Sequence, residues 1–351
     1  MKKVITTILV GLTIFSALSA YNPPLGGESL YDYSSPEALA GRKSVTGGAL
    51  FAAGADSLVI NPSLAAREQR VNLNLGYTFL HSMDEANKHK VGSAFQLGLL
   101  IPSKMFVFSS YINGTFLPFK ELNLGNSFSF HTGLAKEITD KLDIGLSINT
   151  GIAWNETVSW ALGANLGFNY LQGDLGFIKD FRYGASILNL GKNFNLPENI
   201  GPASGPSTHF PNIATIKMGA SGTLFNNNFM KIGAALDLTT AMFQNLVVDF
   251  NAQFLFNNMI YVSIGEKINI SEACYNRWSA IPSVGIGVNF KFNVNNIDYL
   301  DSKGWNESEM TVNAAYKNLY SSVNAYSIGA DVDMGMQDTV APVITIIEED
   351  E

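Results

Sequence analysis

The sequence predicts an all-β fold, a 14-stranded antiparallel transmembrane β-barrel preceded by an N-terminal plug segment. Three observations support this prediction. Most of the chain alternates bulky apolar with small polar residues over many short stretches, as the strands of a membrane barrel do. Charged residues make up only 15% of the 351 residues, whereas soluble proteins typically contain about a quarter. Along the chain, short connections between the stretches alternate with connections that are mostly longer, which is typical of outer-membrane barrels.

The first twenty residues have the layout of a secretory signal peptide. Lys2 and Lys3 precede an uncharged apolar run over residues 4–18, and small residues ending at Ala20 provide a cleavage site. An N-terminal anchor helix is the alternative. No later apolar stretch approaches the roughly 20 residues that a membrane-spanning helix needs, which leaves a periplasmic, secreted or outer-membrane protein. The barrel pattern described below favours the outer membrane.

Residues 21–70 do not alternate and are rich in small residues, so they do not fit the wall of a barrel. Ser35 and Pro36 are typical of a helix N-cap and first helical position, and Gly41 could end that helix. Residues 56–62 resemble a short capped helix broken by a turn. We expect this compact segment to fill the bore as a plug; a periplasmic extension that packs against nothing is the alternative.

Residues 71–335 carry the period-two pattern of the barrel. Leu73 and Leu75 fall on one side of the first strand, whereas Asn72 and Asn74 fall on the other. A soluble sandwich also alternates, but its polar face is normally rich in charged residues; here that face is mostly Gly, Asn, Ser and Thr. The predicted strands cover residues 71–80, 91–101, 105–117, 127–138, 142–154, 158–172, 181–189, 214–224, 230–240, 246–256, 260–267, 282–292, 309–318 and 322–333.

The lengths of the connections predict which way the barrel points. If the first strand runs outward, the periplasmic connections at 102–104, 139–141, 225–229 and 257–258 are short. The outer connections at 81–90, 118–126, 190–213 and 268–281 are mostly longer, as in known outer-membrane barrels. The short outer turn at 155–157 and the long inner connection at 293–308 are exceptions. Residues 336–351 follow the last strand and are expected to form an acidic periplasmic tail.

Charged residues on the inward side of the strands are candidate lumen groups. With a five-residue connection at 225–229, Lys217 would lie opposite Asp237, and the next pairing would set Asp237 opposite Asp249. Lys217 or Arg182, also inward, could receive a ligand carboxylate, because a cation in a partly dry cavity favours an anion. The alternative is that Lys217, Asp237 and Asp249 form a structural ion-pair row along the lumen wall.

Other kinds of function find little support in the sequence. The net charge of −8 argues against a basic surface that would bind nucleic acid. The single cysteine, Cys274, excludes an internal disulfide and a cysteine-based metal site. No catalytic triad, zinc-protease helix or phosphate-binding loop is present. We therefore expect no enzyme activity, no metal site and no cofactor.

The plug segment contains a recognisable motif, made up of Gly48, residues 52–57 with Asp56, and Asn61, Pro62 and Ser63 with the following Leu64 and Ala65. With this motif the segment resembles the hatch of the FadL-type outer-membrane long-chain fatty-acid transporters, including their PorV-like and spirochaete branches. Ser63 departs from the family's usual Ala, and the next Gly of the motif is missing. Residues 189–191, 256–258 and 264–265 also look like turns of the family.

The resemblance implies passive uptake of hydrophobic small molecules, with long-chain fatty acids as the expected ligand and no energy coupling. The ligand would enter from outside, occupy an apolar pocket and leave when the hatch shifts or through a gap in the wall. Membrane lipid and the barrel-assembly machinery are the other expected partners. The alternative is a PorV-like barrel that acts as a protein-interaction or secretion partner, or a surface adhesin displaying residues 190–213.

Overall fold

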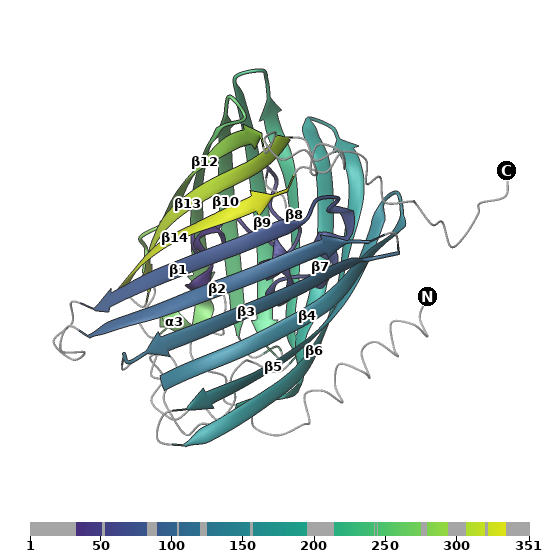
Figure 1. The fold of residues 1–351 in the computed structure, drawn as a ribbon. Coiled ribbons are helices and arrows are strands. Elements are labelled where there is room, and N and C mark those ends of the chain that lie inside the picture. Colours follow the sequence, from purple (N-terminus) through teal and green to yellow (C-terminus); the bar gives the residue numbers. More distant parts are fainter. Residues whose placement is uncertain are drawn as a thin grey trace.

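The structure is a computed structural model that describes residues 33–50, 53–82, 90–103, 105–119, 125–154, 157–194, 214–241, 243, 245–274, 279–293, 307–319 and 322–334. Within these ranges, 14 antiparallel strands form one closed barrel in which β1 pairs with both β2 and β14 (Figure 1). The predicted architecture of the wall is therefore confirmed. The expected signal peptide and acidic tail lie outside the described residues.

The strand boundaries agree with the predicted ranges to within three residues at every end. This agreement includes the last two strands. The strands are β1 (Asn72–Ser82), β2 (Val91–Pro102), β3 (Val107–Leu117), β4 (Gly125–Thr139), β5 (Leu142–Trp154), β6 (Val158–Leu175), β7 (Ile178–Lys192), β8 (Thr215–Asn226), β9 (Met230–Ala241), β10 (Leu246–Phe256), β11 (Ile260–Asn269), β12 (Ser283–Asn293), β13 (Glu307–Leu319) and β14 (Val323–Asp333).

The two faces of the wall differ in chemistry as the alternation predicts. On β5, Leu146 and Ile148 are 59% and 56% exposed on the outside, whereas Ser147 and Asn149 between them are buried on the inside. The same exposure of large apolar side chains recurs around the barrel. A band of this kind is stable only against hydrocarbon, because in water each such side chain would lose the free energy of burial.

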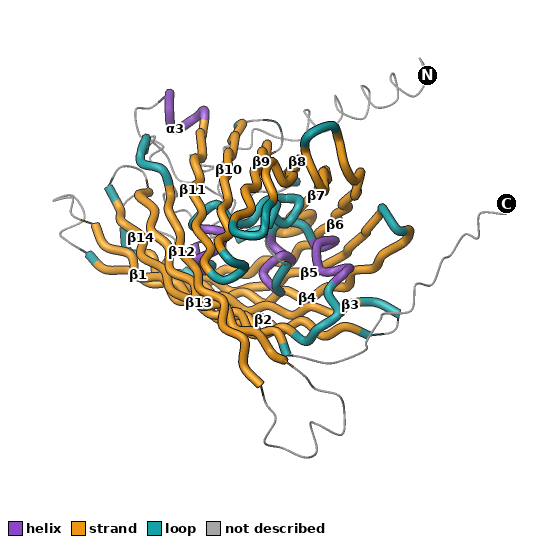
Figure 2. The backbone as a smooth tube through the Cα atoms, turned by 90° about the horizontal axis from the view of Figure 1, so that it is seen from above, coloured by secondary structure: helices purple, strands orange, loops and turns teal. Residues whose placement is uncertain are grey.

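The N-terminal elements lie within the ring of strands, as the view from above shows (Figure 2). They are α2 (Pro36–Leu39), η2 (Ala55–Val59) and η3 (Pro62–Arg67). Ser35 caps α2 by accepting a hydrogen bond from the Ala38 amide, and Gly41 follows with a φ of 69°, which glycine adopts without strain. η3 packs against β4, β5 and β6. None of the helices in the described part of the chain is long and apolar enough to cross a membrane.

One further helix was not predicted. α3 (Ile270–Cys274) directly continues β11 at its outer end, within the segment expected to be an outer loop. Five residues are too few to produce a recognisable helical period, which explains why the sequence did not indicate it.

Candidate functional site: the barrel lumen

The lumen becomes apolar toward the end of the barrel where β1, β3 and β5 finish, which we call the outer end after the predicted topology. Inward side chains at the outer ends of six strands cluster there with residues of the N-terminal segment and two loop phenylalanines. We call this cluster the outer apolar layer. It comprises Tyr33, Leu39, Ala40, Leu80, Leu117, Phe119, Ala153, Ala161, Phe194, Ala315, Leu319, Val323 and Ala325.

Sequence reasoning missed this layer, although a signal for it was present. At the outer end of a strand the alternation fails and both faces become apolar, as in Phe79-Leu80 and Phe116-Leu117. In each pair the first residue is exposed outside the wall and the second is completely buried within it. The break in the pattern therefore marks where the lumen changes from a polar to an apolar lining.

Below the outer apolar layer, the hatch motif fixes the N-terminal segment to the wall by hydrogen bonds. The Asn61 side chain donates to the carbonyls of Val45, at 2.7 Å, and Phe168 on β6, at 3.0 Å. Its Oδ1 accepts from the Ser63 amide at 3.1 Å and the Ser63 hydroxyl at 2.8 Å. Asn61 therefore caps η3 and also ties it to the barrel.

Glycines in the wall make this close approach possible. A Cβ at Gly145 would collide with the backbone of Pro62 and Ser63, and a Cβ at Gly167 would overlap the Asn61 side chain. At Gly133 a Cβ would lie 2.6 Å from Leu58 Cδ2. The inward glycines of β4, β5 and β6 thus form a flat surface on which η2 and η3 rest.

A buried ionic cluster holds the other side of the N-terminal segment. Lys43 Nζ lies 2.8 Å from Glu37 Oε2 and also contacts Asp56. Arg42 lies 3.7 Å from Glu37 and donates to Asn313 on β13, while the Asn313 amide donates to Glu37 at 2.9 Å. We call these five residues the ionic cluster. Asp56 additionally accepts a 2.9 Å hydrogen bond from the Ser35 hydroxyl.

The pKa values of the ionic cluster reflect this pairing. Burial by itself would raise the pKa of Glu37, but the nearby charges of Lys43 and Arg42 outweigh it and lower the pKa from 4.5 to about 2. For Lys43, burial opposes the charged form, but Asp56 and Glu37 raise its pKa above the ordinary value. Both groups are therefore charged at neutral pH, and the cluster is an ion-paired contact rather than a set of neutral groups.

The predicted row of charges is only partly assembled. Asp237 lies opposite Asp249, as predicted. Lys217, however, lies opposite Thr239 and not Asp237, whose partner on β8 is Gly219. The prediction of that pair was wrong because β8 extends to Asn226, which leaves a three-residue connection to β9. A bulge between Thr223 and Phe225 moves the register back by one residue, since the bulged strand carries an extra residue, but this does not restore the predicted pair.

The inward charges contact the N-terminal segment as well as the wall. Asp237 accepts a 2.9 Å hydrogen bond from the Val45 amide, and Arg182 donates to the Ala49 carbonyl at 3.1 Å. Asp249 lies 3.5 Å from Lys267 on β11, a residue that sequence reasoning did not select. The observed contacts of Asp237 and Arg182 are thus consistent with a positioning role toward the segment. Whether Lys217 or Arg182 binds a ligand stays a prediction.

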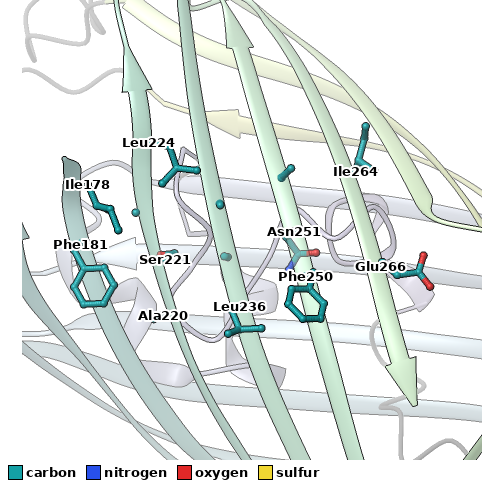
Figure 3. A pocket seen from close by; sticks show the side chains of 14 residues that line it. Ile178, Phe181, Ala220, Ser221, Leu224, Leu236, Phe250, Asn251, Ile264 and Glu266 are labelled. Atoms are coloured by element: carbon teal, nitrogen blue, oxygen red, sulfur yellow. The ribbon is translucent and has the colours of Figure 1, made fainter. Parts of the chain in front are cut away.

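A groove of about 490 Å³ lies across β7 to β11 on the outside of the wall (Figure 3). Its lining includes Leu236, Phe250 and Ile264, which are all exposed outward-facing side chains. The groove therefore belongs to the outer surface and not to the lumen. Among the described residues, no group of His, Cys, Asp and Glu could hold a metal ion.

Comparison with known proteins supports the fold but does not identify a family. No protein-family profile matches the chain, and no curated protein sequence matches it. Among solved structures, a deltaS2S3 mutant of the monoaromatic hydrocarbon channel TodX aligns with a TM-score of 0.52 and 12% identity, covering 85% of this chain and 98% of the channel. The monoaromatic hydrocarbon channel CymD aligns with a TM-score of 0.50 and 12% identity, covering 88% and 98%.

A third structure, a FadL homologue from Pseudomonas aeruginosa, aligns with a TM-score of 0.46 and 8% identity, covering 85% of this chain and 98% of the homologue. The expected spirochaete or PorV-like branch stays a prediction. From the TodX and CymD alignments, we conclude that this chain has the fold of the hydrocarbon-channel barrels.

Proposed function

We propose that the protein is an outer-membrane channel for the passive passage of hydrophobic small molecules, with long-chain fatty acids as the expected ligand. The observation that carries this proposal is the outer apolar layer. An ion or sugar channel keeps its lumen polar throughout, whereas here Leu80, Leu117 and Val323 turn apolar side chains inward. Such a lining favours a ligand that leaves water for an apolar surface.

The N-terminal segment would act as the hatch of this channel, with residues 21–70 as one functional unit. Beside its apolar contacts, it is held to the wall by hydrogen bonds and ion pairs, including those of Asn61, Asp237 and the ionic cluster. Polar contacts of this kind can exchange for contacts with water when the segment shifts. We therefore propose that the segment moves to let a ligand pass, without enzyme chemistry or a cofactor.

The neighbouring structures support the proposed class of ligand through what their names state. TodX and CymD are channels for monoaromatic hydrocarbons, so the barrel architecture accommodates hydrophobic cargo in those proteins. Long-chain fatty acids enter the proposal through the hatch motif at Asp56, Asn61, Pro62 and Ser63. Outer-membrane location, contact with membrane lipid and insertion by the barrel-assembly machinery complete the proposal.

Uptake by intact cells tests this function. Cells that produce the protein should accumulate radiolabelled oleate faster than cells that do not produce it. Small molecules that copurify in mild detergent should include hydrophobic ligands by mass spectrometry. Equal uptake by both cell types would contradict the proposal. A protein partner recovered by cross-linking, without any bound lipid, would instead favour the interaction function.

A further inference from the structure

We propose that Phe119 and Phe194 form an aromatic gate in the outer apolar layer. The recesses that their rings occupy are the first binding subsites of the lumen, and they accept apolar groups no wider than one aromatic ring. This inference deepens the proposed function and rests on it for the direction of passage. It adds a location, two residues and a size limit for the ligand.

Both phenylalanines belong to connections, yet both are buried within the barrel. Phe119 follows β3 and is 0% exposed, and Phe194 follows β7 and is 1% exposed. Connecting segments normally run over the surface of a protein. Two loop side chains that turn into the lumen and join its apolar cluster therefore close the lumen at the level where a ligand from outside would first arrive.

Each ring lies in a recess made by a glycine of the wall. A Cβ at Gly92 on β2 would lie 2.8 Å from Phe119 Cε2, and a Cβ at Gly151 on β5 would lie 3.1 Å from Phe194 Cζ. Both glycines point inward, Gly92 near the outer end of β2 and Gly151 near the outer end of β5. The wall is thus shaped to receive a flat ring at these two places, and a side chain of any size at either glycine would crowd it.

The rings hold the places that a ligand would take. A phenylalanine buries about 150–250 Å² of surface, so leaving a recess empty would cost free energy. An incoming apolar group of the same width can replace the ring in the recess with little net loss of buried surface. A wider, fused-ring molecule cannot replace a phenylalanine ring in this way. The floor of each recess is strand backbone that is paired on both sides, so it cannot yield to a second ring without breaking a ladder.

Binding of two fluorinated probes to the full-length protein tests the gate. We expect Phe119→Ala and Phe194→Ala each to bind fluorobenzene roughly tenfold more tightly than the unmodified protein, because each leaves an apolar cavity of ring size, and such cavities bind benzene-like molecules. The matched control is Phe116→Ala, which removes a ring that is 43% exposed on the outer face beside Leu117. Binding is measured by ¹⁹F NMR in mild detergent, with protein-free micelles as the blank.

The second probe, 1-fluoronaphthalene, tests the size limit. We expect it to bind the Phe119→Ala, Phe194→Ala double variant no more tightly than the unmodified protein, because the strand backbone still limits the width of each recess. Gate variants that bind fluorobenzene no more tightly than Phe116→Ala would overturn the proposal, as would equal binding of both probes by the unmodified protein. If an alanine variant fails to fold, judged by heat-modifiable migration in gels, Phe119→Leu and Phe194→Leu keep most of the volume and should show a smaller gain in the same direction.

The outcomes separate this inference from the proposed function. Tighter fluorobenzene binding by the gate variants, together with no oleate uptake by cells, would contradict the proposed function and support the two subsites. Oleate uptake by cells with no change in probe binding by the gate variants would contradict the gate and support the channel function.

Discussion

Replacing Lys43 by methionine tests how the N-terminal segment is held in the barrel. Lys43 Nζ lies 2.8 Å from Glu37 Oε2 and also contacts Asp56, and the two carboxylates are 9% and 1% exposed. Methionine keeps the apolar stem but leaves both buried carboxylates without their shared cation. We expect the segment to loosen from the wall while the strand ladders, in which Lys43 takes no part, stay intact.

The magnitude follows from the burial of the ion pair. Removing one partner of a buried ion pair costs roughly 3–5 kcal/mol. Arg42 stays 3.7 Å from Glu37, so the lower end is the better expectation. A loss of about 3 kcal/mol raises the open population of the segment roughly a hundredfold.

Hydrogen exchange measured by mass spectrometry checks this expectation. In Lys43→Met, peptides within residues 33–67 should exchange roughly a hundredfold faster, whereas peptides of β4 to β6 should keep their protection. The control is Lys179→Met, because the Lys179–Asp174 pair is 54% exposed at both side chains and exposed pairs contribute little. The reasoning is refuted if residues 33–67 exchange as in the unmodified protein, or if barrel strands lose protection to the same extent.

Three further predictions follow from the same contacts. First, the stabilisation by Glu37 is present above pH 4.5 and is lost as the pH falls toward about 2, because its pKa is lowered in the folded state. Exchange of residues 33–50, corrected for intrinsic rates, should be constant from pH 7 to 5 and should accelerate only below about pH 4; acceleration already at pH 6 would contradict this. Second, Asn61→Ala removes the cap of η3 and its bond to Phe168, and it should cost about 2 kcal/mol in the opening of residues 55–67, read by the same exchange; Ser63→Ala, which loses one bond, should cost less. Third, if Lys217 or Arg182 receives a ligand carboxylate, Lys217→Met or Arg182→Met should weaken oleate binding while leaving binding of the uncharged methyl oleate unchanged. Unchanged oleate affinity with a lower melting temperature would show a structural role instead.

The wall of the barrel could be predicted because the pattern that specifies it depends only on neighbouring residues along each strand. Whether a residue such as Leu146 or Ser147 faces outward or inward is decided by its parity along the strand, and hydrocarbon and lumen select opposite chemistries for the two parities. The helix caps at Ser35 and Asn61 are equally local, since each bonds to an amide two or three residues away. The sequence therefore determined the strands, their order and the start of the helix at Pro36.

Cross-strand partners and the lumen interior needed the folded chain. Lys217 does not lie opposite Asp237 because the turn after β8 is shorter and comes later in the chain than predicted. A bulge near Phe225 offsets only one residue of that change, and neither feature leaves a periodic trace in the sequence. The recesses beneath Phe119 and Phe194 join residues of different strands and loops. The parity of a residue along its strand gives only the face of the wall on which it lies. Which distant group it contacts there depends on closure of the barrel, which pairs β1 with β14 and places the N-terminal segment against the inner face of the wall.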